Sequence, residues 1–312
     1  MKSNKVLHFS LKLATVVVIL CILMYAAAVG IYAVSFNYRY ETSEADAYSV
    51  DDFAELTRER HSFKTMQGHN LVGYLYESTN EDVEESALII FAHGLGGGGQ
   101  TGYMDIFDYL VQMGFYVFAY DATGNDESEG DVIGGLPQGY IDLDYAVSYA
   151  EGIEKTKDMP VVLIGYSWGG LSVANVLNYH PEVKAVVSIA GWNCSLDMMD
   201  HVGRNMIGDK GGTLLPFLAL HERLMYGKYA SSTAMSGFEN SDCRVMIVHG
   251  ELDQVIPIEY GYEKYYEKYG ESERFSFKKY ADRDHDVIRT ADGATDMALF
   301  SEIVDFINQS LN

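Results

Sequence analysis

The sequence predicts an α/β fold in which helices cover both faces of a mostly parallel sheet, behind one apolar N-terminal helix. Short, β-rich apolar segments alternate with segments of helical periodicity across residues 61–312. These apolar segments are nearly continuous, which is typical of parallel strands buried on both faces. One long uncharged stretch precedes the alternation.

The strand-like segments are 71–76, 87–92, 115–120, 161–165, 185–190, 245–249 and 274–279. The helical segments are 104–113, 140–155, 170–179, 260–269 and 295–311. Residues 192–240 contain no clear strand. Their four bases and five acids make them nearly neutral, and they include five methionines. We expect them to form a small helical cap, inserted into one α/β domain that spans residues 61–312.

Residues 13–36 form a stretch of 24 residues without a charged side chain. As a helix, this stretch would be about 36 Å long, enough to cross a hydrocarbon core of about 30 Å. We therefore expect a tail at 1–12, a transmembrane anchor at 13–36, and a linker at 37–60 that ends in a short amphipathic helix. A cleaved signal peptide is the alternative, with Ala26 to Ala28 as its cleavage motif, but signal peptides typically have a shorter apolar core of about 7–15 residues.

The charges of the leader predict its orientation. Lys2, Lys5 and Lys12 precede the apolar stretch, and residues 1–36 contain no acid. Because positively charged flanks stay in the cytoplasm, we expect a single-pass protein of the cell membrane with its N-terminus inside and its large domain outside.

The overall charge limits the possible partners. The chain has 22 bases and 45 acids, and its net charge of −23 provides no broad positive surface for a nucleic acid. Its three cysteines have no metal-binding spacing. Cys194 and Cys243 could pair outside the cytoplasm or remain buried thiols.

The motif around Ser167 indicates nucleophilic catalysis. The strand at 161–165 leads into Gly165-Tyr166-Ser167-Trp168-Gly169, a G-x-S-x-G motif, and a helical segment follows. A serine on such a strand-to-helix turn projects its hydroxyl above the sheet. The context therefore predicts a serine nucleophile.

A serine nucleophile needs a base, and the base needs an acid to hold its tautomer. Enzymes with this turn place the acid and then the histidine after later strands. Glu251 and Asp253 follow the strand at 245–249, and either could be the acid. His285 follows the strand at 274–279 and is the only histidine after Asp253. We expect His285 to be the base.

Two backbone amides are expected to stabilise the oxyanion. One is the amide of Trp168, directly after the nucleophile. The other is the amide of Leu95, in the loop His93-Gly94-Leu95-Gly96-Gly97-Gly98-Gly99 that follows the strand at 87–92. The histidines of the His-Gly pairs, His93 and His249, are interpreted as structural. No G-K-[ST] follows the glycines, so a phosphate-binding P-loop is excluded.

These motifs resemble those of the α/β-hydrolase superfamily over roughly residues 61–312. The similarity consists of HGLGGGG, D-x-x-G-x-x-x-S-x-G from Asp121 to Gly130, GYSWGG, GELDQVIP and the DHD around His285. It implies the α/β-hydrolase fold and favours Asp253 over Glu251 as the acid. The motifs resemble those of the serine aminopeptidase-like and monoacylglycerol-lipase-like members, although Asp126 and Thr123 stand where these proteins often have Gly and Arg or His.

We therefore expect a membrane-anchored serine hydrolase that cleaves a carboxylic ester through an acyl-enzyme, with no metal or organic cofactor. Its substrate would be a small-molecule or lipid-like acyl compound, because the methionines of the cap could line an apolar site or could simply pack the cap onto the core. A serine peptidase is the alternative, in which Asp197, Asp200 or Glu222 could bind a peptide amino terminus. A non-catalytic binding protein is the third hypothesis.

Overall fold

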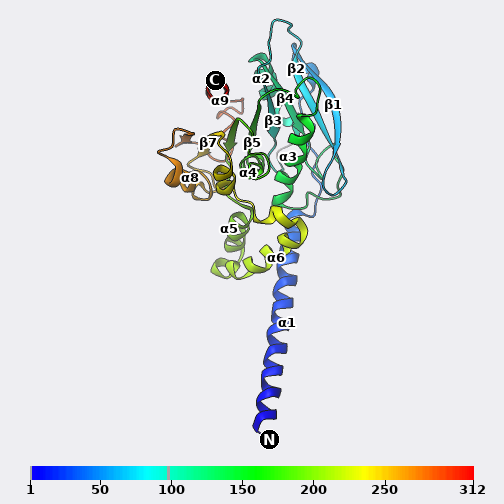
Figure 1. Cartoon of the computed structure of the whole chain (residues 1–312), viewed down its shortest axis with the longest axis vertical. Helices are drawn as coiled ribbons and strands as arrows, with labels where there is room; N and C mark the ends of the chain where they lie inside the picture. The colour runs from blue at the N-terminus through cyan, green and yellow to red at the C-terminus, as the bar shows by residue number, and fades with distance from the viewer. Residues whose placement is uncertain (1, 97–98) are drawn as a thin grey trace.

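The computed structural model describes residues 2–96 and 99–312. In these residues, eight strands form one sheet in the order β1-β2-β4-β3-β5-β6-β7-β8 (Figure 1). The strands are β1 (Leu56–Lys64), β2 (Asn70–Ser78), β3 (Ala87–Ala92), β4 (Phe115–Tyr120), β5 (Val161–Tyr166), β6 (Ala185–Ile189), β7 (Arg244–Gly250) and β8 (Phe275–Tyr280). From β4 to β8 in this order, neighbouring strands pair in parallel. Strand β2 pairs antiparallel with both β1 and β4.

Helices cover both faces of the sheet. Side chains of α2 (Met104–Gln112) and α9 (Met297–Leu311) pack in the core on one face. Side chains of α3 (Leu136–Ala150), α4 (Trp168–Val176) and α8 (Tyr262–Tyr269) pack in the core on the other. Every residue of β3 and β6 is buried, as expected for central parallel strands with helices on both sides. The predicted α/β-hydrolase fold is confirmed.

The structure differs from the expected linker at residues 50–60. Only Val50–Asp52 is helical, as the short 3-10 helix η1, and β1 begins at Leu56. Apolar residues at helical spacing predicted a longer helix here, but pairing with all nine residues of β2 overrides that local preference. The largely exposed, polar character of β1 is typical of an edge strand.

The segment between β6 and β7 is helical. It contains α5 (Ser195–Ile207), η3 (Gly208–Leu214), α6 (Leu215–Tyr226), η4 (Gly227–Ser231) and α7 (Ala234–Asn240). Helix α7 packs against α4, whereas α5 and α6 extend away from the sheet (Figure 1). The outer part of the cap is therefore α5, η3 and α6, and we use the name "outer cap" for these three elements.

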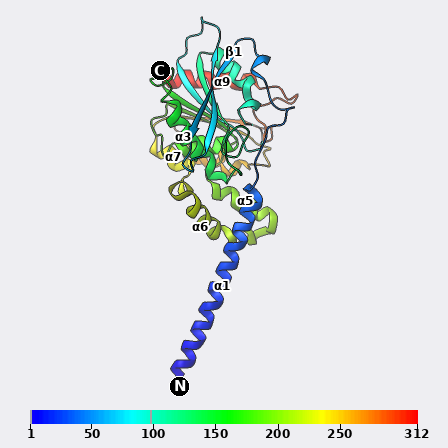
Figure 2. The same cartoon turned by 90° about the vertical axis from the view of Figure 1, so that its right-hand side faces the viewer.

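Helix α1 (Lys2–Phe36) projects from the domain (Figure 2). Its Val6–Phe36 portion is long and apolar enough to cross a membrane. The helix has two unlike halves: the side chains of residues 6–23 are exposed, whereas Ala28, Tyr32 and Phe36 are buried. These three residues lie one helical turn apart and face the outer cap, because α1 packs against α6 and η3.

Candidate active site

Ser167 lies on the turn between β5 and α4. Its backbone has φ of 56° and ψ of −113°, a strained conformation for a residue with a side chain. The flanking glycines make the tight turn possible. A Cβ atom at Gly165 would lie 2.1 Å from the carbonyl oxygen of Gly169, and one at Gly169 would lie 1.9 Å from that of Ala92. The glycines of the G-x-S-x-G motif are therefore required by the close approach of the backbone.

His285 bridges Ser167 and Asp253. Its Nε2 atom lies 2.9 Å from Ser167 Oγ, and its Nδ1 atom lies 2.7 Å from Asp253 Oδ2. The three side chains come from the turns after β5, β7 and β8, which end at the same edge of the parallel sheet. Tyr166 supports this loop, because its hydroxyl donates to the carbonyl oxygen of His285. The arrangement can carry a proton from the serine to the imidazole.

Asp253 is held as a carboxylate. Its Oδ1 atom accepts hydrogen bonds from the amides of Val255 and Ile256, at 2.9 and 2.8 Å. Burial alone would raise its pKa, but hydrogen bonds from His249, His285 and the Ile256 amide outweigh burial and hold the pKa of Asp253 well below its ordinary value. His249 is fully buried, and its Nε2 atom lies 2.9 Å from the carbonyl oxygen of Ile256, so it supports the loop that carries the acid.

Glu251, the other candidate acid from the sequence, does not contact His285. Glu251 lies at the surface, where its carboxylate is 3.3 Å from Lys279 Nζ. Asp253 is thus the residue of the GELDQVIP segment that contacts His285. Glu251 provides a matched control for experiments on Asp253, because both carboxylates follow the same strand.

The glycine-rich loop after β3 approaches Ser167. A Cβ atom at Gly94 would lie 3.5 Å from Ser167 Cβ, which places the loop that contains Leu95 beside the serine. Trp168 begins α4 directly after Ser167, and its indole Nε1 donates to the carbonyl oxygen of Leu136. His93 Nε2 accepts from the amide of Ala122. Gly97 and Gly98 of the same loop lie outside the described residues.

The segment before η1 packs against this loop, a feature that the sequence did not reveal. Asp126 accepts hydrogen bonds from the amide and hydroxyl of Thr42 and from the amide of Gly99, at 2.6, 2.7 and 2.9 Å. The amide of Gly99 also lies 2.9 Å from Thr42 Oγ1. Asp126 has a positive φ of 37°, and it stands where similar proteins often have Gly. The unusual residue at this position was the one available signal for the contact.

A cavity of about 930 Å³ opens beside His285. Its lining comes from residues 40–48, the glycine-rich loop, η2 (Gln100–Tyr103) and the loops after β7 and β8. Asp46, Asp284 and Asp286 lie on its wall, together with Arg289, which forms an ion pair with Asp105. In the described part of the chain, no cap residue lines this cavity. The linker therefore contributes more to its wall than the sequence suggested.

The three cap acids that could bind a peptide amino terminus, Asp197, Asp200 and Glu222, have partners within the protein. Asp197 pairs with Lys264 at 2.9 Å, and Asp200 pairs with Arg204 at 2.8 Å. Glu222 is fully buried and accepts hydrogen bonds from the hydroxyls of Tyr32 and Ser195. Burial raises the pKa of Glu222 to about 7, although these two hydrogen bonds oppose the shift.

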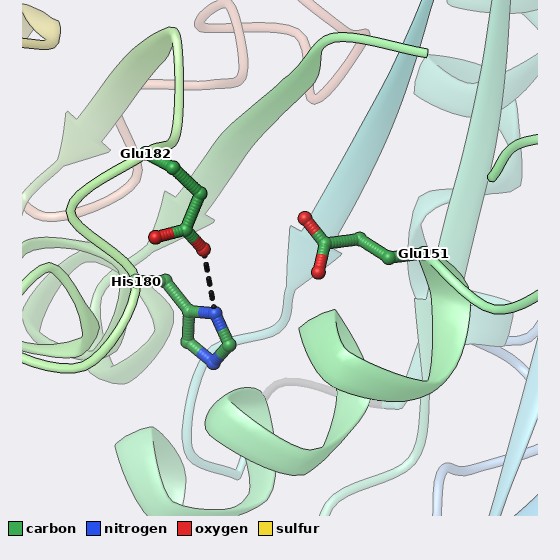
Figure 3. A group of neighbouring side chains, drawn as sticks. All are labelled: Glu151, His180 and Glu182. Carbon is green, nitrogen blue, oxygen red and sulfur yellow. Dashed lines mark hydrogen bonds and ion pairs between the residues drawn. The ribbon is translucent and has the colours of Figure 1, made fainter. Parts of the chain in front are cut away.

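A second group of ionisable side chains lies away from Ser167. Glu151, His180 and Glu182 bring potential ligand atoms within 4.8 Å of one another (Figure 3). However, the Nδ1 atom of His180 lies 3.0 Å from Glu182, and its Nε2 atom lies 2.9 Å from Asp144. With both nitrogens facing carboxylates, His180 fits a buried ion pair rather than a metal ligand.

The fold is that of the α/β hydrolases. The family profile described as the alpha/beta hydrolase fold matches residues 87–232, which contain β3 to β6, Ser167 and most of the cap. Over this segment, just under half of the chain, the sequence is similar to the α/β-hydrolase superfamily.

Similarity to individual proteins is distant. The chain is 28% identical over 152 residues to the quorum-quenching protein AidA of Acinetobacter baumannii, covering 46% of this chain and 49% of AidA. The chain thus matches about half the length of this curated relative.

Several solved structures have the same fold. The Pyrococcus furiosus esterase Pf2001 superposes with a TM-score of 0.65 at 16% identity, covering 88% of this chain and 99% of that one. The Pyrococcus horikoshii acylaminoacyl peptidase gives 0.63 at 15% identity, covering 83% of this chain and 42% of that one. Est1E of Butyrivibrio proteoclasticus, with ferulic acid bound, gives 0.58 at 16% identity, covering 80% and 99%. At such identities the likeness concerns the fold alone.

Proposed function

We propose that this protein is a membrane-anchored serine hydrolase that cleaves a carboxylic ester, such as an acyl ester or acylglycerol-like compound. Ser167 would be the nucleophile, His285 the base and Asp253 the acid that orients it. The observation that carries the proposal is the continuous chain of contacts from Asp253 through His285 to Ser167 Oγ, at 2.7 and 2.9 Å.

The reaction would proceed in two acyl transfers. His285 Nε2 takes the proton of Ser167 while the serine oxygen attacks the ester carbonyl, and the amides of Leu95 and Trp168 stabilise the oxyanion. The C–O bond to the leaving group then breaks, and the leaving alcohol receives the proton from His285. Water, deprotonated by His285, attacks the acyl-enzyme and releases the carboxylic acid and free Ser167.

The partners of the cap acids favour an ester over a peptide substrate. A peptidase that binds an amino terminus through the cap needs an available carboxylate there. Asp197 and Asp200 are instead paired with Lys264 and Arg204, and Glu222 is buried between α1 and α5. Breaking such pairs to bind an amine would cost part of the binding energy.

One observation keeps the peptidase as a second candidate. Asp46, Asp284 and Asp286 lie on the wall of the cavity beside His285, where Arg289 is already paired with Asp105. The excess of carboxylates there would attract a cationic group such as an α-amine. The acidic wall is thus the feature that a peptide substrate would use.

The location that we propose is the cell membrane, with residues 13–36 as the anchor, residues 1–12 in the cytoplasm and the catalytic domain outside. The lysines that precede the anchor support this orientation. Protease treatment of intact cells tests it: the domain should be cleaved from the cell surface. Full protection of the domain from the protease would contradict the proposed orientation.

A substrate panel on the full-length protein in detergent tests the reaction itself. The full chain is required, because α1 packs against the cap. Turnover of p-nitrophenyl esters by wild type and Glu251→Gln, but not by Ser167→Ala, would support the esterase. Faster turnover of aminoacyl amides than of esters would favour the peptidase. No turnover of either class by the folded protein, together with no labelling by a fluorophosphonate, would overturn both.

A further inference from the structure

The outer cap lies on the side of the molecule from which α1 projects (Figures 1 and 2). Five large apolar side chains of α5 and α6 are about half exposed or more: Met206 (63%), Ile207 (51%), Leu220 (49%), Leu224 (67%) and Met225 (57%). Leu220 and Leu224 lie one turn apart on α6, and Met225 follows Leu224. Such a group of exposed apolar side chains indicates a contact surface rather than isolated hydrophobic residues.

Specific contacts fix the outer cap beside α1. The hydroxyl of Tyr25 lies 3.4 Å from His221 Nδ1, and the ring centroids of Tyr32 and His221 are 4.9 Å apart. Tyr32 also donates a hydrogen bond of 3.2 Å to the buried carboxylate of Glu222. Helix α6 is therefore held against the second half of α1, at residues 25–32.

The length of α1 then indicates where the outer cap lies relative to the bilayer. A hydrocarbon core of about 30 Å corresponds to about 20 helical residues. Counted from Leu13, the first residue after Lys12, such a span reaches its outer end near Tyr32. Because α6 contacts α1 from Tyr25 to Tyr32, the outer cap lies at the level of the outer leaflet. If the span instead began at Val6, it would end near Tyr25, and the outer cap would rest on the headgroups.

The charge of the outer cap suits the same environment. Residues 201–228 contain four bases and two acids, and one of these acids, Glu222, is fully buried. In the described residues, no carboxylate lies in ion-pair distance of Lys210 or Arg223, both of which are exposed. The rest of the domain is strongly acidic, since residues 37–200 and 229–312 together contain 15 bases and 43 acids. Basic side chains around apolar ones are typical of surfaces that lie on phospholipid.

We propose that the outer cap binds the lipid bilayer beside the anchor, with Ile207, Leu220, Leu224 and Met225 among the acyl chains and Lys210 and Arg223 at the phosphates. This inference rests on the proposed membrane anchor. The protein would then be held at two sites, by α1 through the bilayer and by the outer cap on its surface. The two contacts would fix the orientation of the domain, so that Ser167 stays at a constant height above the lipid.

Fluorescence quenching in vesicles tests the proposal. The full-length protein, with Cys21→Ala and Cys194→Ser, receives one new cysteine at a time: Leu224→Cys, Ile207→Cys, Val18→Cys or Met113→Cys. Cys243 is buried and stays. Each protein is labelled with bimane and reconstituted into vesicles of phosphatidylcholine and phosphatidylglycerol that carry a nitroxide on the acyl chain. Met113 is an exposed apolar residue between α2 and β4, at the edge of the sheet opposite Ser167, and serves as the control for an exposed site away from the cap.

The proposal predicts that the nitroxide lipid quenches the probes at residues 224, 207 and 18, whereas aqueous iodide quenches the probe at residue 113. Quenching at residue 18 together with iodide quenching at residues 224 and 207 would overturn the cap contact and leave the anchor intact. Protection of the cap probes from both quenchers would indicate a second protein copy on this face, and would also overturn the proposal. Iodide quenching at residue 18 would overturn the anchor and, with it, the cap contact.

Discussion

His285 and His180 are both held by carboxylates, yet their second ring nitrogens face different groups. His285 contacts Asp253 through Nδ1 and the hydroxyl of Ser167 through Nε2. His180 contacts Glu182 through Nδ1 and Asp144 through Nε2. A neutral imidazole offers one donor and one acceptor, whereas an imidazolium donates from both nitrogens. His285 can therefore accept the serine proton, and His180 is suited to remain protonated.

The pKa values agree with this contrast. Burial would lower the pKa of His180, but its hydrogen bonds to Asp144 and Glu182 outweigh burial and raise it. Asp253, in contrast, is held as a carboxylate by donors that include His249 and two backbone amides. Residue type therefore does not determine the role of a histidine–carboxylate pair. The group that faces the second nitrogen determines it.

The largest expected effect is the loss of the nucleophile. Ser167→Ala should lower kcat by about 10⁴-fold or more, because the acyl-enzyme can no longer form. Thermal unfolding should be nearly unchanged, since the substitution removes one oxygen atom. His180→Gln, measured at a temperature where it is folded, should keep wild-type kcat. An equal loss of kcat in Ser167→Ala and His180→Gln would contradict the different roles that we assign to His285 and His180.

Removing the charge of the acid should have the next largest effect. Asp253→Asn should lower kcat by about 10⁴-fold, because an amide stabilises the wrong tautomer and no longer balances the imidazolium. Glu251→Gln is the matched control and should have near wild-type kcat, since Glu251 pairs with Lys279 at the surface. A larger loss of kcat for Glu251→Gln than for Asp253→Asn would show that Glu251, and not Asp253, is the acid. Steady-state kinetics on the best ester of the panel provides the measurement.

The contact between the linker and the glycine-rich loop should have an intermediate effect. Asp126→Asn keeps a side chain that tolerates positive φ, but it weakens the hydrogen bonds to Thr42 and Gly99. We expect kcat to fall by about 10-fold, as displacement of a catalytic group by a fraction of an ångström does. Glu44→Gln changes an exposed side chain of the same linker; it is the control and should have no effect. Unchanged kinetics for Asp126→Asn would show that the linker does not position the loop.

The smallest effect is on stability. Glu182→Gln should lower the free energy of unfolding by about 1–2 kcal/mol, a value below that of a fully buried pair because Glu182 is half exposed. Since folding raises the pKa of His180, the pair stabilises the fold fully below the ordinary histidine pKa, and this stabilisation is lost as the pH rises through the folded value. Urea unfolding of wild type and variant should therefore differ most at mildly acidic pH and least at alkaline pH. A difference that grows with pH would contradict the assigned charge.

The sequence predicted the parts of the fold whose signal is local. The strands β3 and β4 begin and end at the predicted residues, because each is a continuous apolar segment bounded by polar residues. Ser167 and His285 were identifiable for a similar reason: each follows a recognisable strand, and the order along the chain restricts the choices. Strand β1 was missed, since its charged residues depend on pairing with β2 rather than on their own preference.

Features that depend on contacts distant in sequence were not predictable. Thr42 and Asp126 are 84 residues apart, and no local pattern indicates their hydrogen bonds. The lining of the cavity by residues 40–48 and the packing of α1 on α6 have the same origin. The methionines of the cap also divide in a way that composition does not indicate: Met198 and Met199 are buried, whereas Met206 and Met225 are exposed.

The most direct test of the central claim, that Ser167 is an activated nucleophile, is intact mass spectrometry of the full-length protein after treatment with a fluorophosphonate. The predicted result is a single adduct that maps to Ser167 and appears together with loss of ester hydrolysis. Ser167→Ala and Asp253→Asn should remain largely unmodified, whereas His180→Gln and Glu251→Gln should react like wild type. A folded wild-type protein without an adduct, or with its adduct on another residue, would contradict the account.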